Sequence, residues 1–330
     1  MPLAIHWLVL CIPSLALLGP RVASADEWAS EVPIQTETPI QPSVVDSAEL
    51  DVEVVPPLRP YQAHLLRKWF EKVGQRRAGE TFGDLLVRAG RWQIGQRYGG
   101  VRKNPDAEET EQLRVDLSRF ECVSLVESTI AVARCVWQGQ PNEQCFAREV
   151  VASRYRDGEP VGYASRLHYF SDWIEDNDKR DRIERLTEML GGEPMIQPFN
   201  YMSQHPREYD GLADATELAQ ILDVEARLSS QQHYVLDKRT VAKIQDQLQN
   251  GDLVAIVSNK HPGLMIGHVG FVDRVMAGKP RYLHASSYHQ RVVLTRTDIA
   301  HYVTSQTHRL GILVLRPVPP KTPYKLAQLR

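Results

Sequence analysis

The stretch that decides the fold is 251-GDLVAIVSNKHPGLMIGHVGFVDRV-275. Its two ends are short runs rich in β-branched residues with a turn between them, a pattern that predicts two neighbouring β-strands. Three further segments of the same character follow along the chain, at residues 281–287, 291–295 and 310–318. The C-terminal part of the protein is therefore predicted to be a run of strands.

The chain before this stretch has a different period. Apolar residues recur at helical spacing in six segments, at residues 61–75, 81–96, 118–137, 165–177, 214–230 and 237–250. Thr81 and Asp84 are expected to cap the second helix, and Gly251 is expected to end the last one. Because the helices come first and the strands follow, we expect an α+β domain in which helices cover a C-terminal antiparallel sheet.

Composition and the N-terminus bound the class of protein. The 330 residues are 42% hydrophobic and 24% charged, with a formal net charge of −2, so no broad basic field favours nucleic acid. The apolar start ends in Ala23-Ser24-Ala25, which predicts a signal peptide at 1–25 and an exported, periplasmic product; an uncleaved membrane anchor is the alternative. A Pro- and acid-rich tether is expected at 26–58, one catalytic domain at 59–320 and a tail at 321–330.

Three cysteines remain once Cys11 leaves with the signal peptide. Cys135 and Cys145 are close enough in sequence to pair. If one helix carries both Cys122 and Cys135, a rise of about 1.5 Å per residue separates them by roughly 20 Å. A disulfide needs Cα atoms within about 7 Å, so Cys122 is predicted to be the free thiol. The alternative is three reduced cysteines packed as small hydrophobic residues.

The helix at 118–137 presents this thiol. Ser118 and Glu121 have the spacing of a capping box, which predicts a helix that begins at Ser118 with Cys122 in its first turn. Free backbone N–H groups and the helix dipole stabilise an anion there, so a lowered thiol pKa is expected. The competing interpretation is a cysteine that only packs the first turn.

Two histidines lie in apolar strands and supply a candidate base for the thiol. His268 and His284 are an even number of residues apart, so a hairpin centred on Met276 would place them on one face and directly opposite each other. A buried pair satisfied by the backbone is one alternative. A zinc site formed by Cys122, His268 and His284 is another, although no compact metal-binding spacing supports it.

The order of these elements resembles the NlpC-type, papain-like cell-wall hydrolase superfamily. The matching pieces are the cysteine at a helix start, 267-GHVGF-271 and 283-LHAS-286. The resemblance implies Cys122 as nucleophile, His268 as base and His284 as its orienting partner. The segment 95-GQRYGG-100 is similar to a tyrosine-bearing segment of that superfamily, which implies an active-site role for Tyr98. In the superfamily an Asp usually precedes the nucleophile, where Glu121 stands here.

A closer resemblance is to the amidase branch of this superfamily, over roughly residues 80–316. It is carried by 121-ECVSLVE-127, 154-RYRDGEPVGYASRLHYFSDWIEDN-177 and 199-FNYMSQHPREY-209, together with the strand motifs. This implies hydrolysis of the amide between N-acetylmuramic acid and L-alanine in peptidoglycan or its fragments, without a cofactor or metal. We expect a monomer, with no transmembrane segment after signal removal, whose substrate groove contains five residues: Ser165, Arg166, His168, Tyr169 and Trp173.

Two other functions stay open at the level of sequence. The same fold could act as an endopeptidase that cuts within the stem peptide. It could also be a catalytically silent peptidoglycan-binding protein. The residues near 165–173 have a plain structural interpretation as well, because Leu167, Phe170 and Ile174 would form the buried side of an amphipathic helix.

Overall fold

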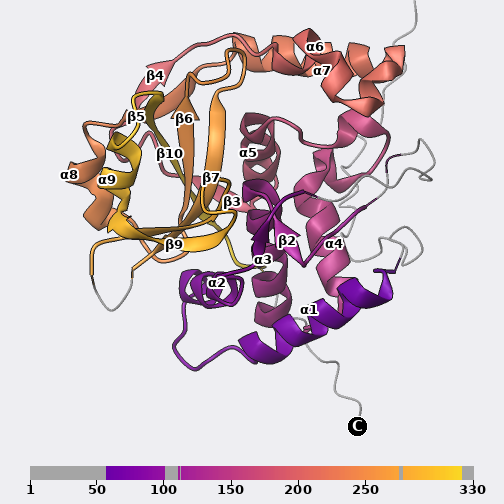
Figure 1. Cartoon of the computed structure of the whole chain (residues 1–330), viewed down its shortest axis with the longest axis vertical. Helices are drawn as coiled ribbons and strands as arrows, with labels where there is room; N and C mark the ends of the chain where they lie inside the picture. The colour runs from indigo at the N-terminus through magenta and orange to yellow at the C-terminus, as the bar shows by residue number, and fades with distance from the viewer. Residues whose placement is uncertain (1–56, 101–110, 112, 275–277, 322–330) are drawn as a thin grey trace, which may run out of the picture. The chain divides into compact units, whose positions relative to one another are not determined.

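The central feature is a curled, mostly antiparallel sheet (Figure 1). The computed structural model describes residues 57–100, 111, 113–274 and 278–321, all within the unit Leu50–Arg330. In this part of the chain the strands are β1 (Arg97–Tyr98), β2 (Arg119–Phe120), β3 (Ile183–Arg185), β4 (Glu193–Met195), β5 (His233–Asp237), β6 (Leu253–Ser258), β7 (Ile266–Asp273), β8 (Arg281–Ser286), β9 (Arg291–Asp298) and β10 (Arg309–Pro317).

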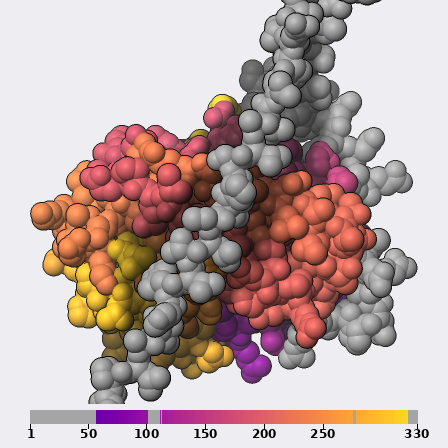
Figure 2. All heavy atoms as spheres, turned by 90° about the horizontal axis from the view of Figure 1, so that it is seen from above, coloured from indigo at the N-terminus to yellow at the C-terminus, as the bar shows by residue number. Residues whose placement is uncertain are grey.

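Helices surround this sheet. They are α1 (Pro60–Val73), α2 (Phe82–Arg91), α3 (Cys122–Trp137), α4 (Glu143–Arg154), α5 (Phe170–Lys179), α6 (Tyr201–Gln204), α7 (Ala215–Ser230), α8 (Val241–Ile244) and α9 (Ile299–Thr304). Seen from above, the salmon atoms around α6 and α7 form one side of the molecular face and the orange to yellow C-terminal segments form the other (Figure 2). None of the helices in the described ranges combines the length and apolar character needed to cross a bilayer.

The strand order is β2-β1-β9-β8-β7-β6-β10-β5-β4, with β3 paired to β10. The last strand in sequence, β10, therefore lies in the interior of the sheet, between β6 and β5. Neighbours pair antiparallel except for β1 and β2, which are parallel. This short parallel pair brings Tyr98 beside the segment that leads into α3.

Alternation along the strands divides the core in two. On one face Ala255, Val269 and Leu283 are buried in the cluster that also contains the apolar residues of α3. On the other face Ile256, Val272 and Tyr282 pack with residues of α8 and α9. Both sides of β6 are fully buried, which explains its continuous apolar sequence.

The sequence predictions are confirmed where segments are long and regular. All five C-terminal strands form, α1 and α7 occupy the predicted segments, and Thr81 caps α2 with Asp84 as its partner. The predicted helix at 237–250 is wrong, because only α8 and one 3₁₀ turn form there. The helix expected from Ser165 begins only at Phe170, after a 3₁₀ turn at Tyr163–Ser165.

The disulfide between Cys135 and Cys145 forms and joins α3 to α4, while Cys122 stays free. The predicted signal peptide at 1–25 lies outside the described residues. So do almost all of the predicted tether at 26–58 and of the tail at 321–330.

Candidate active site

Cys122 is the first residue of α3, and it follows directly on the short strand β2. The predicted helix start at Ser118 is wrong by four residues. Arg119 and Phe120 pair with β1 as a strand, and Ser118 instead bonds to Asp116. The N-cap is Glu121, whose backbone N–H donates to Ser124 Oγ at 3.0 Å. The capping box is thus formed by Glu121 and Ser124, three residues further along than predicted. It places the Cys122 sulfur at the first residue of the helix.

The thiol itself is protonated in this setting. Burial raises the pKa of Cys122 to about 11. Backbone N–H groups of Val269, Val123 and Cys122 itself favour the thiolate, but they do not offset the loss of solvation, and Glu121 opposes it. The expected lowering of the pKa is therefore wrong for the resting protein, because desolvation exceeds the effect of the helix N-terminus.

His268 and His284 are joined by a hydrogen bond of 2.7 Å between Nε2 of His268 and Nδ1 of His284. They lie on one face of β7 and β8, as expected from their even spacing. They are not directly opposite each other, because Val272 pairs with Tyr282 and the register is two residues away from the predicted one. The two rings are diagonal neighbours, and the tip of the hairpin around Met276 lies outside the described residues. Gly270 leaves space between them, since a Cβ there would lie 2.8 Å from His284 Cβ.

Both imidazoles are held neutral. Burial, followed by the positive charge of Arg309, lowers the pKa of His268 to about 4. Burial and the neighbouring His268 lower the pKa of His284 to about 2. Tyr282 stacks on His284 with centroids 4.8 Å apart, and the Tyr302 ring lies edge-on at 5.2 Å. Sequence analysis missed these two tyrosines, although Tyr282 stands two residues before His284 and so shares its face.

Cys122 is connected to the histidine pair through shared neighbours. Its sulfur is against the backbone N–H of Val269, the neighbour of His268 in β7. The thiol also acts electrostatically on Tyr282 and Tyr302, both of which contact His284. The described residues contain no hydrogen bond from Cys122 to His268. Catalytic hydrogen bonds in ligand-free enzymes are often long and shorten when substrate binds.

Tyr98 is the fourth residue of this group. It is half-buried in β1, and burial is the main cause that raises its pKa, followed by the nearby Cys122 and Glu121. Its backbone N–H donates to Gln290 O, in the turn between β8 and β9. The structure therefore brings Tyr98, Cys122, His268 and His284 to one end of the sheet.

The residues predicted for the substrate groove divide into two groups. Tyr169 and Trp173 are each 1% exposed. Tyr169 OH donates to Glu225, and Trp173 stacks on Phe170. Their predicted role in stacking on a sugar ring is wrong, because both rings belong to the core.

The other three stay closer to the surface. Arg166 is exposed and Ser165 is half-buried, with its hydroxyl donating to Gly162 O at 2.8 Å. His168 Nε2 lies 3.0 Å from Tyr163 O, and burial lowers the pKa of His168 to about 3. His168 thus holds the turn that presents Arg166.

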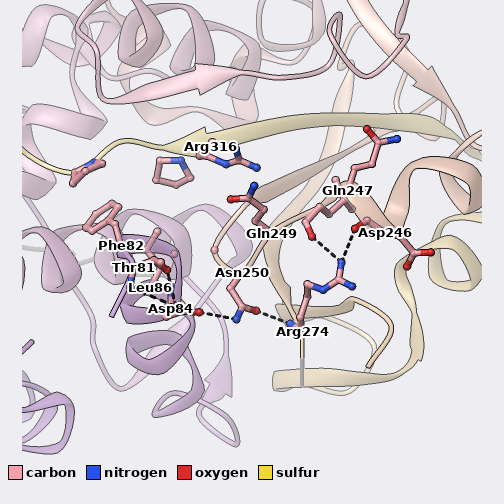
Figure 3. A pocket seen from close by; sticks show the side chains of 15 residues that line it. Thr81, Phe82, Asp84, Leu86, Asp246, Gln247, Gln249, Asn250, Arg274 and Arg316 are labelled. Atoms are coloured by element: carbon pink, nitrogen blue, oxygen red, sulfur yellow. Dashed lines mark hydrogen bonds between the residues drawn. The ribbon is translucent and has the colours of Figure 1, made fainter. Parts of the chain in front are cut away.

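A polar pocket of about 570 Å³ lies elsewhere, between the start of α2 and the segment before β6 (Figure 3). Arg274, which lines it, follows β7 and is six residues from His268, about 20 Å along a strand. Within the pocket Asn250 bridges Asp84 and the backbone of Arg274, and the Arg274 guanidinium donates to backbone carbonyls. It is thus separate from the cysteine–histidine group.

A metal site receives no geometric support in the described ranges, where no three His, Cys, Asp or Glu side chains are arranged to hold an ion. His268 and His284 each use one ring nitrogen on the other.

Several solved structures are similar to this chain. An N-acetylmuramoyl-L-alanine amidase from Bacteroides uniformis is 29% identical with a TM-score of 0.64, covering 72% of this chain and 98% of its own. A Bacteroides fragilis protein provisionally named a xylanase is 32% identical with a TM-score of 0.62, covering 69% of this chain and 98% of its own. A Legionella pneumophila protein at 18% identity and a TM-score of 0.59 covers 78% of this chain and 95% of its own, and it shares the fold.

Among curated proteins no sequence matches this chain. The model of one protein family matches residues 88–312, which include α3 and the strands that carry both histidines. The chain belongs to the N-acetylmuramoyl-L-alanine amidase-like family.

Proposed function

We propose that the protein is an exported cysteine amidase that hydrolyses the amide between N-acetylmuramic acid and L-alanine in peptidoglycan or its fragments. The observation that carries this proposal is the His268–His284 hydrogen bond beside a free thiol at the N-terminus of α3. Membership of the N-acetylmuramoyl-L-alanine amidase-like family supports the assignment of the bond that is cut. The arrangement of nucleophile on a helix and base on a sheet supports a papain-like, NlpC-type mechanism.

The hydrogen bond between the histidines determines which ring nitrogen of His268 can accept the proton of Cys122. Because His268 Nε2 is bonded to His284 Nδ1, His268 Nδ1 is the nitrogen left to accept the proton of Cys122. His284 accepts from Nε2–H, which keeps His268 in that tautomer and supports its positive charge. Burial disfavours each charge alone, so the resting pair is neutral and the proton moves when the substrate carbonyl is in place.

The chemical steps then balance without a further reactant except water. Sγ of Cys122 bonds to the lactyl carbonyl carbon, and N–H groups at the start of α3 stabilise the oxyanion, with the Tyr98 hydroxyl as a further donor. The C–N bond breaks as protonated His268 gives its proton to the L-alanine nitrogen. Water, deprotonated by His268, then attacks the thioester, releases the muramic acid carboxyl group and restores the thiol.

Export is supported by two features of the chain. The disulfide between Cys135 and Cys145 is typical of an oxidising compartment. The apolar N-terminus with its Ala23-Ser24-Ala25 site has the form of a secretory signal. The substrate class of the family also lies outside the cytoplasmic membrane.

The test is digestion of defined muropeptides by wild type and Cys122→Ala, read by mass spectrometry. Wild type is expected to release a peptide that begins with L-alanine together with free N-acetylmuramic acid. Cys122→Ala is expected to lose on the order of 10⁶-fold in kcat, because the covalent route is removed. The variant Cys135→Ala/Cys145→Ala removes the disulfide but keeps the Cys122 thiol, so it is expected to stay active wherever it is folded. Xylan, which the name of the Bacteroides fragilis neighbour suggests, serves as a second substrate.

Other outcomes would identify the competing functions. An intact muramoyl-dipeptide among the products would show an endopeptidase. Cleavage that persists in a folded Cys122→Ala variant would contradict the cysteine mechanism. Binding without cleavage by wild type would identify a peptidoglycan-binding protein.

A further inference from the structure

Arg309, the first residue of β10, lies on the same side of the sheet as the histidine pair. It is opposite Ser258 of β6, and Ile256, two residues earlier on that strand, is opposite His268 of β7. Alternate residues of a strand project to the same side. Arg309 and His268 therefore share a face, with one strand between theirs, and Arg309 is half-buried there.

Aromatic rings connect the guanidinium to the histidines. Cζ of Arg309 lies 4.0 Å from the centre of the Tyr302 ring, which is a cation–π contact. Tyr302 in turn packs against His284 with 5.2 Å between the ring centres, and His284 is hydrogen-bonded to His268 at 2.7 Å. Tyr282 closes the cluster, because its ring centre lies 5.0 Å from that of Tyr302 and 4.8 Å from that of His284. One ring thus separates the Arg309 charge from the histidine pair.

Hydrogen bonds hold Arg309 in this place. Its Nη1 donates to the backbone oxygen of Tyr302, and also to Ser305 Oγ at 3.3 Å. Both partners are uncharged, and within the described part of the chain Arg309 forms no ion pair with a carboxylate. The guanidinium is therefore fixed on Tyr302 while its positive charge stays uncompensated by any described residue.

Both imidazoles respond to this charge. Arg309 contributes to the lowered pKa of His268, after burial, and to that of His284, after burial and the effect of His268. The other titratable groups around the pair and the thiol are Cys122 and Glu121 of α3, Tyr282 of β8, His289 of the following turn and Tyr302 of α9. Among all of these, Arg309 is the group that is positively charged at every physiological pH.

We propose that Arg309 is a positioning residue for the histidine pair, whose charge, held on Tyr302, favours the neutral form of His268 that accepts the Cys122 proton. This inference rests on the proposed amidase function and assigns a role to a residue that does not touch the reacting atoms. A like charge nearby disfavours an imidazolium ion. Arg309 therefore keeps the base unprotonated in mild acid, and it makes protonated His268 readier to give its proton to the leaving nitrogen.

The direct test is an NMR titration of the histidine side chains in the Cys122→Ala protein, because this readout does not depend on turnover. His268→Gln and His284→Gln identify the signals. His268 should stay mostly neutral from pH 7 to 4.5, since its pKa is lowered to about 4. Adding Arg309→Gln should raise the midpoint of His268 by on the order of one pH unit, because the imidazolium no longer meets a like charge.

Two further variants serve as controls. Arg309→Lys keeps a positive charge at the same place and should give a midpoint close to that of wild type. Arg239→Gln is the matched control, because Arg239 is an exposed arginine just after β5, a neighbour of β10, and pairs with Asp237. It should leave the midpoint unchanged. Arg309→Met, which is neutral and retains an apolar contact with the Tyr302 ring, replaces Arg309→Gln where that variant does not fold.

The catalytic counterpart is the pH profile of kcat/KM on a defined muropeptide. Its low-pH limb reports the base of the free enzyme. Arg309→Gln should move this limb to higher pH in step with the NMR midpoint, and its loss of activity should be smallest at pH 7, where His268 is neutral in both proteins. A residue that only supported the fold would lower activity to the same extent at every pH.

The outcomes separate this inference from the function on which it rests. If His268 titrates alike with and without the Arg309 charge, the positioning role is overturned and the amidase function is untouched. If Arg309→Lys raises the midpoint as much as Arg309→Gln does, packing rather than charge sets it, which also overturns the role. If wild type cleaves no muropeptide while the midpoint still rises in Arg309→Gln, the amidase proposal fails and the effect of Arg309 on the pair stands.

Discussion

Gly270 is the residue on which the histidine pair depends most directly. A Cβ at this position would meet Leu283 O at 2.6 Å and His284 Cβ at 2.8 Å. The neighbouring glycine of β7, Gly267, is less constrained, because its nearest contact would be Ser258 Cβ at 3.2 Å. Gly270 thus allows β7 and β8 to approach closely enough for the ring nitrogens to bond.

Gly270→Ala should therefore separate the histidines. We expect activity on muropeptides to fall at least tenfold and the free energy of unfolding to fall by about 1–3 kcal/mol, the range for overpacked sites. Gly267→Ala should lose less of both. Denaturant unfolding and muropeptide cleavage measure the two effects, and equal losses in both variants would contradict this role for Gly270.

For single residues, the sequence predicts which face of a strand a side chain occupies better than it predicts which residue lies opposite. The even spacing of His268 and His284 was enough to place them on one face. Their register was not predictable, because it depends on where the hairpin turns. The helix cap was misassigned because Ser118 and Glu121 have the same spacing as Glu121 and Ser124, and only pairing of β2 with β1 decides between them.

At the scale of the elements, a disulfide joins α3 to α4. Cys135 near the end of α3 bonds to Cys145 in the first turn of α4. The closed loop is short, and a cross-link of this kind stabilises a protein by about 2–4 kcal/mol, chiefly by restricting the unfolded chain. Because α3 begins with Cys122, the bond also anchors the helix that presents the thiol.

The double variant Cys135→Ala/Cys145→Ala should lower the free energy of unfolding by that amount, measured in urea. Cys122→Ala is the control, since it removes a cysteine from α3 without opening the loop, and its loss should be smaller. Titration of denatured wild type with a thiol reagent should find one thiol before reduction and three after it in the mature chain. Three thiols before reduction would contradict the cross-link.

Elements of different length were predictable to different degrees. Strands such as β6 and β10 contain long runs rich in β-branched residues. Such runs favour strands over helices, so these elements were predictable. Strands β1 and β2 have two residues each and carry no periodic signal. The predicted helix at 237–250 had an apolar period, but tertiary packing allowed only a turn of it.

For the molecule as a whole, buried histidines set the response to acid. Burial lowers the pKa of His168 to about 3, of His268 to about 4 and of His284 to about 2. In the unfolded chain a histidine titrates near pH 6.5. Below that pH the unfolded chain binds protons that the folded chain does not, so the stability present above pH 6.5 is lost as pH falls.

We therefore expect the free energy of unfolding to decrease between pH 6.5 and 4.5, with a slope approaching about 1.4 kcal/mol per pH unit for each histidine. Urea unfolding at several pH values measures it. His168→Gln should reduce the slope by about a third, and a free energy that stays constant over this range would contradict the neutral, buried state of these rings.

The position of β10 has a consequence for synthesis. This strand follows all of its partner strands in the sequence, yet it fills the gap between β6 and β5. A chain that lacks β10 leaves β3, β5 and β6 without a partner on that side and has an incomplete core beneath α3, even when the cysteine and both histidines are already made. A stop before Arg309 should thus yield an aggregating, inactive product, and activity should appear only after β10 has been made.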